Sequence, residues 1–320
     1  MMRDFVRSLL KAELHVHVEG TLEPELAFAL AQRNGITLPY PGVQALAEAY
    51  RFDDLQSFLN LYYACSEVLR TPADFEELAD AYLRRAAADG VRHVELFFDP
   101  QSHTGRGVPL GDVIAGLDAA ASGAAARHGL SVQLIACFLR DRPVGEAMAT
   151  LEALSPHLDA VSGVGLDSAE VGHPPADFAG VFDAARGLGL HVVAHAGEEG
   201  PPDYVWEALD VLGVERVDHG IRAVEDAALL RRLAVDQVPL TVCPLSNVRL
   251  RCVESMEGHP LPKLLDAGVL VTLNSDDPAY FGGYLGDNYL AVQEAFGLDR
   301  AVMQQLAGNS LAASFLPADA

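Results

Sequence analysis

The sequence has few lysines and little positive charge. Only Lys11 and Lys263 are lysines among its 320 residues, and 22 basic residues stand against 45 acidic ones, for a formal net charge of −23. Nucleic acids and anionic membranes bind basic surfaces, so this balance argues against both as partners. An acidic surface favours solubility without identifying a partner, and no pattern in the sequence indicates an oligomeric state.

Long apolar runs and paired cysteines are missing as well. No apolar stretch approaches the roughly 20 residues that span a bilayer, and residues 1–14 contain no signal-like apolar run. The four cysteines are scattered without a Cys-x-x-Cys spacing, which supports neither a thiolate zinc site nor a dithiol redox motif. We therefore expect a cytoplasmic protein.

Strand-like and helix-like stretches alternate along the whole chain, with no linker of low complexity between them. Eight short segments rich in Val, Leu and Ile are predicted strands: 11–17, 91–98, 131–139, 161–167, 190–195, 216–219, 239–243 and 269–274. Eight β/α units over this length predict an α/β fold, a (β/α)8 TIM barrel that forms a single domain over residues 1–320. An open doubly wound sheet is the structural alternative, but the first strand leads into histidines instead of a glycine-rich phosphate turn.

The stretch between the first two predicted strands is too long for one crossover helix. It predicts two or three extra helices, around 24–34, 58–69 and 74–88, the last preceded by an N-cap pattern at 71–74. Extra structure after the first strand of a barrel lies at its active-site end and can act as a lid. We expect the aromatic and apolar residues of 58–63 to pack in the core.

Four predicted strand ends carry residues that bind metals or transfer protons. These residues are His15 and His17, His195 and Glu198, His219, and Asp276 with Asp277. Taken singly, each motif is as common in an ordinary strand or turn as it is in a functional site. Together they occupy strand ends of one polarity, the face on which barrel active sites lie. Three histidines and a carboxylate form a zinc set that leaves a position for water.

Several alternative chemistries lack their residues. Binuclear barrel hydrolases commonly bridge their metals with a modified lysine on the fourth strand, and neither Lys11 nor Lys263 stands there. A mononuclear site is therefore favoured, and a metal-dependent barrel amidase or lactonase is the less favoured enzyme class. The Pro-Cys-x-x-Cys motif of small zinc deaminases and the Gly-x-Ser-x-Gly elbow of serine hydrolases are both missing.

In their order along the chain, these motifs resemble the adenosine/adenine deaminase family of zinc-dependent barrel enzymes, from Lys11 to about Ser310. The resemblance rests on AELHVH (12–17), HAGE (195–198), DHG (218–220) and SDDP (275–278). It implies one Zn²⁺ bound by His15, His17, His195 and Asp276. Availability and geometry leave Fe²⁺ and Co²⁺ as alternatives.

The resemblance also implies roles for the remaining residues. Glu198 would be the proton donor to the purine ring, and His219 would orient and help deprotonate the bound water. Asp277 would hydrogen-bond the purine at N7, and Gly165 would turn its backbone toward the ring. A zinc-bound water has a pKa of about 7, and a protonated Glu198 would neutralise the charge that attack at C6 places on N1.

The substrate within this family depends on smaller differences. Family adenosine deaminases usually carry Asp two residues after the second histidine, where this chain has Glu19. The segments 98–103, 165–175 and 278–283 resemble the adenine deaminase branch. We therefore expect adenine, converted to hypoxanthine and ammonia in purine salvage, with Glu19 reshaping the ribose space and Asp167 or Glu170 receiving the N9 proton. Adenosine, an N6-substituted adenine and aminodeoxyfutalosine remain alternatives.

Overall fold

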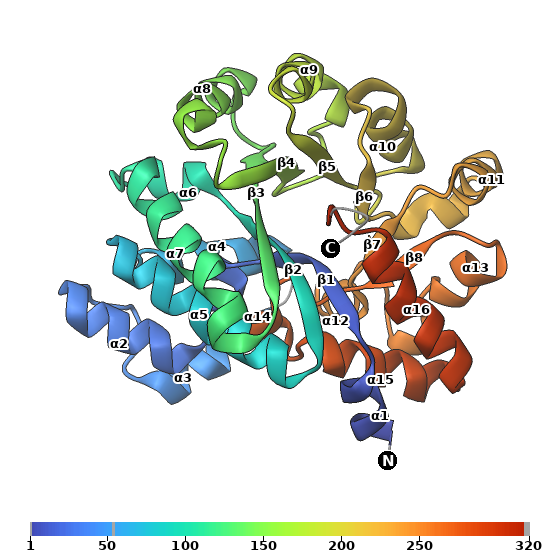
Figure 1. The fold of residues 1–320 in the computed structure, drawn as a ribbon, viewed down its shortest axis with the longest axis horizontal. Helices are drawn as coiled ribbons and strands as arrows, with labels where there is room; N and C mark the ends of the chain where they lie inside the picture. Colours follow the sequence, from blue (N-terminus) through green and yellow to red (C-terminus); the bar gives the residue numbers. More distant parts are fainter. Residues whose placement is uncertain (1, 53–54, 317–320) are drawn as a thin grey trace.

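Eight parallel strands form a barrel in the computed structural model, which describes residues 2–52 and 55–316 (Figure 1). Each strand pairs with the next along the chain, in the order β1 to β8. The strands are β1 (Lys11–His17), β2 (Val91–Phe98), β3 (Ser131–Leu139), β4 (Val161–Asp167), β5 (His191–Ala196), β6 (Arg216–His219), β7 (Leu240–Val242) and β8 (Val271–Leu273). The predicted TIM barrel is confirmed.

The barrel closes just beyond the end of β8. Val16 of β1 forms an isolated parallel bridge with Asp276. The His17 N–H donates to the Asp276 carbonyl over 3.0 Å, and the Asp276 N–H donates to the His15 carbonyl over 3.1 Å. The seam of the barrel therefore lies between the histidines and the aspartate that the sequence singles out.

The predicted strand boundaries agree closely with the structure. The first four strands and the sixth have the predicted bounds, and the others differ by one or two residues at their ends. The fifth strand extends to Ala196 because this residue pairs with His219 of β6. The seventh and eighth are shorter because only three residue pairs join them, from Leu240–Val271 to Val242–Leu273.

Helices surround the barrel and follow most of its strands (Figure 1). Before β2 they are α1 (Met2–Ser8), α2 (Pro24–Asn34), α3 (Val43–Ala49), α4 (Leu55–Ser66) and α5 (Pro72–Ala88). The middle of the chain contains α6 (Pro100–Thr104), α7 (Leu110–His128), α8 (Val144–Leu154), α9 (Ala179–Gly187), α10 (Pro202–Glu207) and α11 (Ala227–Asp236). The last third contains α12 (Pro244–Arg249), α13 (Leu261–Asp266), α14 (Pro278–Phe281), α15 (Leu285–Phe296) and α16 (Arg300–Ala312). Among the described residues, no helix is long and apolar enough to cross a membrane.

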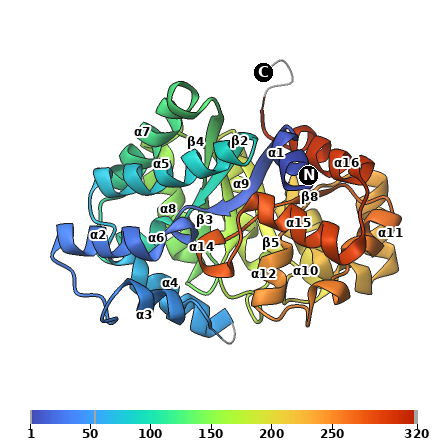
Figure 2. The same cartoon turned by 90° about the horizontal axis from the view of Figure 1, so that it is seen from below.

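The insertion between β1 and β2 forms the extra helices that the sequence predicts. The helices α2, α4 and α5 match the expected ranges within a few residues, and α3 and the short 3-10 helix η1 (Glu19–Thr21) add to them. The helix α5 begins with a capping box, in which Asp74 accepts the Thr71 N–H over 2.8 Å. The helices α2, α3 and α4 lie together at one side of the molecule (Figure 2).

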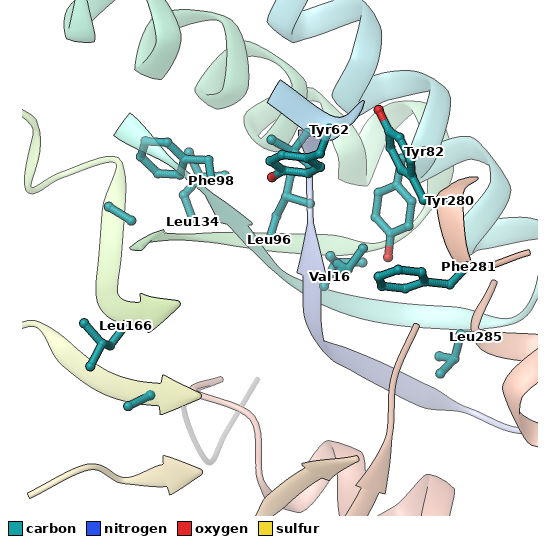
Figure 3. Close-up of a cluster of buried hydrophobic side chains, with 14 of the residues drawn as sticks. Val16, Tyr62, Tyr82, Leu96, Phe98, Leu134, Leu166, Tyr280, Phe281 and Leu285 are labelled. Atoms are coloured by element: carbon teal, nitrogen blue, oxygen red, sulfur yellow. The ribbon is translucent and has the colours of Figure 1, made fainter. Parts of the chain in front are cut away.

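Aromatic side chains connect this insertion to the barrel. The Phe58 ring of α4 lies 4.8 Å from that of Phe281 and 5.5 Å from that of Tyr62, centroid to centroid. Figure 3 shows Tyr62, Phe281 and Tyr280 among the buried side chains near Val16 of β1. The expected burial of α4 residues is confirmed, and some of these side chains also form the wall of the site.

Lys11 lies at the amino end of the first strand, away from the histidines at its other end. Its ammonium is buried and donates to the carbonyl oxygens of Val6 (2.9 Å), Leu9 (3.4 Å) and Asp89 (2.5 Å). A lysine held by three carbonyls at this end of the barrel is unable to bridge metals at the other end, as the sequence predicts.

Candidate active site

A pocket opens at the carboxyl ends of the strands, with an empty volume of about 440 Å³. Its wall combines strand-end polar residues with apolar side chains of α4 and α14. It is lined by His17, Phe58, Leu59, Tyr62, Asp99, Leu139, Asp167, Ser168, His195, Glu198, His219, Leu250, Asp276, Asp277 and Phe281. This is the face of a parallel barrel on which active sites lie.

The four predicted metal ligands meet at this pocket: His17, His195 and Asp276 line it, and the fully buried His15 lies next to Asp276. The Asp276 Oδ1 atom lies 3.2 Å from His15 Nε2 and 3.4 Å from His17 Nε2, and His17 Nε2 lies 3.3 Å from His195 Nε2. Ligand atoms about 2.0–2.1 Å from one ion in a tetrahedral arrangement lie about 3.3 Å apart, so the spacing fits a shared ion. The buried His15 Nε2 has no hydrogen-bond partner among the described residues, as a free ligand nitrogen requires.

A buried carboxylate orients two of these imidazoles. The His15 Nδ1 atom lies 3.0 Å from Thr241 Oγ1, and the Thr241 hydroxyl donates to Asp218 Oδ1 over 2.7 Å. The other Asp218 oxygen lies 3.6 Å from His195 Nδ1. Because the Thr241 hydrogen goes to Asp218, its oxygen accepts from His15 Nδ1–H, which leaves the His15 Nε2 lone pair for a metal.

The third imidazole faces a pair of carboxylates. The His17 Nδ1 atom lies 3.5 Å from Asp167 Oδ2 and 3.9 Å from Asp99 Oδ1. The ligand-type atoms of these three residues also lie within 4.8 Å of one another. Since His17 Nε2 lies next to His195 and Asp276, the carboxylates beside Nδ1 hold the ring in the orientation that a metal ligand needs.

His219 lies in the same cluster, but its ring nitrogens have different hydrogen-bond partners from those of the other histidines. Its ligand atom lies within 4.8 Å of those of His15, His195 and Asp276, so distance alone admits it as a ligand. Its Nε2 lies 3.6 Å from Glu198 Oε2 and 3.7 Å from Asp276 Oδ2. The state of its other nitrogen decides between a ligand and a proton donor.

A chain of three buried hydrogen bonds fixes the tautomer of His219. The Leu261 N–H donates to His259 Nδ1 over 3.1 Å, so the neutral His259 ring carries its proton on Nε2 and donates to Asn247 Oδ1 over 3.1 Å. The Asn247 amide then donates to His219 Nδ1, also over 3.1 Å. His219 therefore carries its proton on Nε2 and is a donor, which leaves His15, His17, His195 and Asp276 as the candidate metal ligands.

Burial lowers the pKa of three of the four clustered imidazoles and so favours their neutral form. It lowers the pKa of His17 to about 4 and that of His219 to about 3, and it lowers the pKa of His195 well below its usual value. At His15 burial also lowers the pKa, but the adjacent Asp276 carboxylate outweighs it and raises the pKa overall. A metal ion would therefore displace a proton from the His15–Asp276 pair.

Glu198 lies beside His219 in the pocket wall, almost fully buried. Burial, with added repulsion from Asp276, Glu170 and Glu199, raises the pKa of Glu198 well above its usual value. Asp277 behaves similarly, since burial and the neighbouring Asp276 raise its pKa, and its Oδ1 has no partner among the described residues. Both groups are suited to donate hydrogen bonds as neutral acids.

The backbone adopts the left-handed conformation at three residues of the pocket wall. The φ angles of Ser168, His219 and Asp276 are 72°, 62° and 65°, in the left-handed region that side chains with a Cβ rarely adopt. All three residues line the pocket. Strained residues of this kind persist only where surrounding contacts hold them, and they cluster at functional sites.

Two expected substrate contacts occupy other places. The Glu19 carboxylate accepts from His103 Nε2 over 2.6 Å and from the Asp99 N–H over 3.2 Å, and Glu19 is not part of the pocket wall. Its additional methylene lets it reach His103 behind that wall, so this contact gives no direct support to the prediction that Glu19 reshapes the ribose space. Gly165 lies inside the barrel within β4, where a Cβ would be 2.6 Å from Cys137 Sγ, and close packing explains this glycine better than contact with the ring.

Glu170 is also removed from the substrate. Its two oxygens accept four backbone N–H groups, those of residues 197–200, and it is not part of the pocket wall. Both oxygens are thus engaged by the backbone of residues 197–200, which gives no support to the predicted contact with a purine N–H. Of the two residues predicted to receive the N9 proton, Asp167 lies in the pocket and has an oxygen, Oδ1, without a partner among the described residues.

The sequence reasoning missed the residues that support the cluster. These are Asp99, Asp218, Thr241, Ser246, Asn247 and His259. Asp99 follows β2 directly and Asp218 precedes His219, so a search of every strand end for carboxylates would have found both. Asn247 and His259 lie beyond β7 in a helix and a loop, where no local spacing signals a contact with His219.

A parallel barrel with three histidines and an aspartate converging at its strand ends defines a metal-dependent barrel enzyme. Residues 10–320 match the family model described as adenosine deaminase, and the chain belongs to this family. The predicted family is confirmed.

Named relatives cover nearly the whole chain. An adenine deaminase of Streptomyces coelicolor is 64% identical over 316 residues, which are 99% of this chain and 93% of that protein. The crystal structure of an adenine deaminase from Arthrobacter aurescens is 52% identical with a TM-score of 0.95, over 97% of this chain and 94% of that one. An amidohydrolase from Burkholderia ambifaria, solved with bound zinc, is 31% identical with a TM-score of 0.92, over 99% and 88% of the two chains.

Proposed function

We propose that the chain is an adenine deaminase, which replaces the C6 amino group of adenine by oxygen and releases hypoxanthine and ammonia. The observation that carries this proposal is the meeting of Glu198 and His219, 3.6 Å apart, beside the three histidines and Asp276. This arrangement combines a proton donor, a hydrogen-bond donor and a set of metal-binding side chains in one pocket. The adenine deaminases to which the chain is similar support the choice of reaction.

We propose that the cofactor is one zinc ion held by His15, His17, His195 and Asp276. The bound zinc of the Burkholderia ambifaria amidohydrolase supports this choice, and the same nitrogen and oxygen donors suit Fe²⁺ or Co²⁺. Such an ion would supply a nucleophilic water at neutral pH. With no lysine near the cluster, a single ion fits the residues better than a bridged pair.

His219 and Asp276 handle the proton of the attacking water. His219 has its proton on Nε2 and a hydrogen-bonded Nδ1, so it donates toward the attacking oxygen and orients it. Asp276 Oδ2 lies 3.7 Å from this nitrogen and is held by the Ser246 hydroxyl over 2.6 Å. The tautomer supports a division of roles in which His219 orients the water and Asp276 accepts its proton.

Glu198 and Asp277 act on the purine ring. Attack at C6 places negative charge on N1, and Glu198, kept neutral by burial, donates its proton there. Asp277 hydrogen-bonds the ring at N7. A Cβ at position 20 would collide with the Asp277 carboxyl. Because Gly20 has none, that carboxyl can lie against the backbone of η1.

Asp167 makes the pocket selective for the free base. Adenine carries an N–H at N9 or N7, whereas a nucleoside carries a sugar at N9. Burial, with added repulsion from Asp99, raises the pKa of Asp167 well above its usual value, so its buried Oδ1 accepts this hydrogen as the carbonyl oxygen of a neutral acid. A substrate without that hydrogen leaves the oxygen unpaired at a cost of about 1–3 kcal/mol. A small purine base is thus the substrate that satisfies the most groups in the pocket.

The variant Glu198→Gln tests the proposed chemistry. The amide cannot deliver a proton to N1, so kcat for adenine should fall by about 1,000-fold while metal content stays unchanged. The exposed Glu146→Gln, which loses only an ion pair with Arg142, is the matched control and should keep the parent rate. Turnover near the parent rate in Glu198→Gln would show that another group is the proton donor.

A further inference from the structure

We propose that Glu170 is a positioning residue, which fixes the backbone of the loop that carries the proton donor Glu198. The loop connects β5 to α10, and Glu170 reaches it from the loop after β4. This inference rests on the proposed function, because it takes Glu198 as the group that protonates the substrate. Glu170 itself touches no reacting atom.

Four consecutive backbone N–H groups converge on the Glu170 carboxylate. Oε1 accepts the Gly197 N–H over 2.6 Å. Oε2 accepts the N–H groups of Glu198, Glu199 and Gly200 over 3.1, 2.8 and 2.7 Å. Successive amides that point at one anion form a concave backbone nest, and here the anion is supplied by the protein's own side chain.

The chain is shaped to bring the carboxylate this close. Gly197 has φ of 71°, in the left-handed region, which lets its N–H and that of the next residue turn to one side. A Cβ on Gly200 would lie 2.6 Å from Glu170 Oε1 and 2.6 Å from a ring carbon of Tyr204, so the glycine lets both side chains approach the loop. Glu170 is itself buried, with 2% of its surface exposed.

The position of Glu198 follows from this nest. Its own amide and both neighbouring amides are fixed to the same carboxylate, so its Cα has little freedom. On the far side, the Arg222 N–H donates to the Gly197 carbonyl over 2.9 Å, and the Arg222 guanidinium donates to the Glu199 carbonyl. With its backbone held on both sides, Glu198 keeps its carboxyl 3.6 Å from His219 without support from the substrate.

The variant Glu170→Gln tests the role, because Gln adds two donors and removes lone pairs opposite the four N–H groups. We expect kcat for adenine to fall by about 100-fold with KM changed by less than about threefold, since the purine contacts are untouched and only the donor is displaced. The metal content should stay at the parent value. Hydrogen exchange of the amides of residues 197–200 should become about tenfold faster or more.

Two further variants complete the test. Gly200→Ala presses on the same carboxylate from the loop side and should show the same loss of kcat, so it decides the question if Glu170→Gln fails to fold. Asp74→Asn is the matched control, because Asp74 is another buried carboxylate that accepts two backbone N–H groups, those of Arg70 and Thr71, at the start of α5. It should lower the melting temperature and leave kcat at the parent value.

Unchanged kcat and unchanged exchange of residues 197–200 in a folded variant would overturn the positioning role. An equal loss of kcat in Asp74→Asn would also overturn it, because the effect would then be one of general stability. The exchange measurement needs no turnover. Failure of the parent protein to deaminate adenine would therefore count against the proposed function, while the exchange data would still confirm or refute the role of Glu170 in holding the loop.

Discussion

The Asn247 side chain donates a hydrogen bond to His219 Nδ1 over 3.1 Å, and this bond decides which nitrogen of His219 carries a proton. The direction of the bond is set further back, by the Leu261 N–H and His259. The consequence is chemical. An imidazole that is held as an Nε2–H donor can orient a nucleophile but is unable to serve as a metal ligand through that nitrogen.

The variant Asn247→Asp reverses this bond. A carboxylate accepts where the amide donated, so the His219 proton moves to Nδ1 and the Nε2 donor is lost. We expect kcat for adenine to fall by about 100-fold with a small change in KM, as measured by steady-state kinetics. The control Asn288→Asp alters a buried amide that accepts the Leu245 N–H outside the pocket, and it should leave kcat near the parent value. Equal rates in Asn247→Asp and the parent would contradict the tautomer assignment.

The assignment also separates the two histidines that compete for the metal. His17→Ala removes a ligand and should purify with little bound metal, whereas His219→Ala should retain about one metal ion per chain and lose activity. Elemental analysis of both proteins after dialysis against the same metal buffer is the measurement. The reverse outcome, with metal lost from His219→Ala and kept by His17→Ala, would exchange the roles of the two residues.

Selectivity for the free base should depend on Asp167. The parent enzyme should deaminate adenine in preference to 9-methyladenine, because the methyl group replaces the hydrogen that Asp167 accepts. In Asp167→Ala the ratio of the two kcat/KM values should shrink by about tenfold or more, since the unpaired oxygen is gone. A ratio that stays the same would show that another group accepts the hydrogen bond from the purine N–H.

Stability should fall in acid partly through His259. Burial lowers the pKa of His259 to about 4, whereas an unfolded histidine has a pKa of about 6.5. Between these two pKa values the unfolded chain binds a proton that the native state does not bind. The free energy of unfolding therefore decreases as the pH falls from 6.5 to 4. The full effect is at most about 3 kcal/mol.

Urea unfolding at pH 7 and at pH 4.5 tests this linkage. The variant His259→Gln keeps a donor toward Asn247 but has no titrating group, so its loss of stability between the two pH values should be smaller than that of the parent. Other buried histidines titrate in both proteins, and the difference between the two losses isolates His259. Equal losses would show that His259 is not kept neutral by burial.

The sequence predicts the barrel well because buried parallel strands are continuous runs of Val, Leu and Ile, which local composition reveals. It also predicts which side chains gather at the strand ends, since strand polarity fixes where His15, His195 and Asp276 must point. It does not place Glu19 and Glu170, whose directions depend on distant partners: His103 for the first and the amides of residues 197–200 for the second. These contacts form only in the folded chain, so no local pattern specifies them.

The central claim is that the chain deaminates the free base adenine, and ammonia release by the purified, zinc-loaded protein tests it most directly. Adenine and adenosine are offered side by side at equal concentrations, with Glu198→Gln as the inactive reference. The account predicts rapid release from adenine and slow release from adenosine. Faster release from adenosine, or none from either purine while the metal is bound, would contradict it.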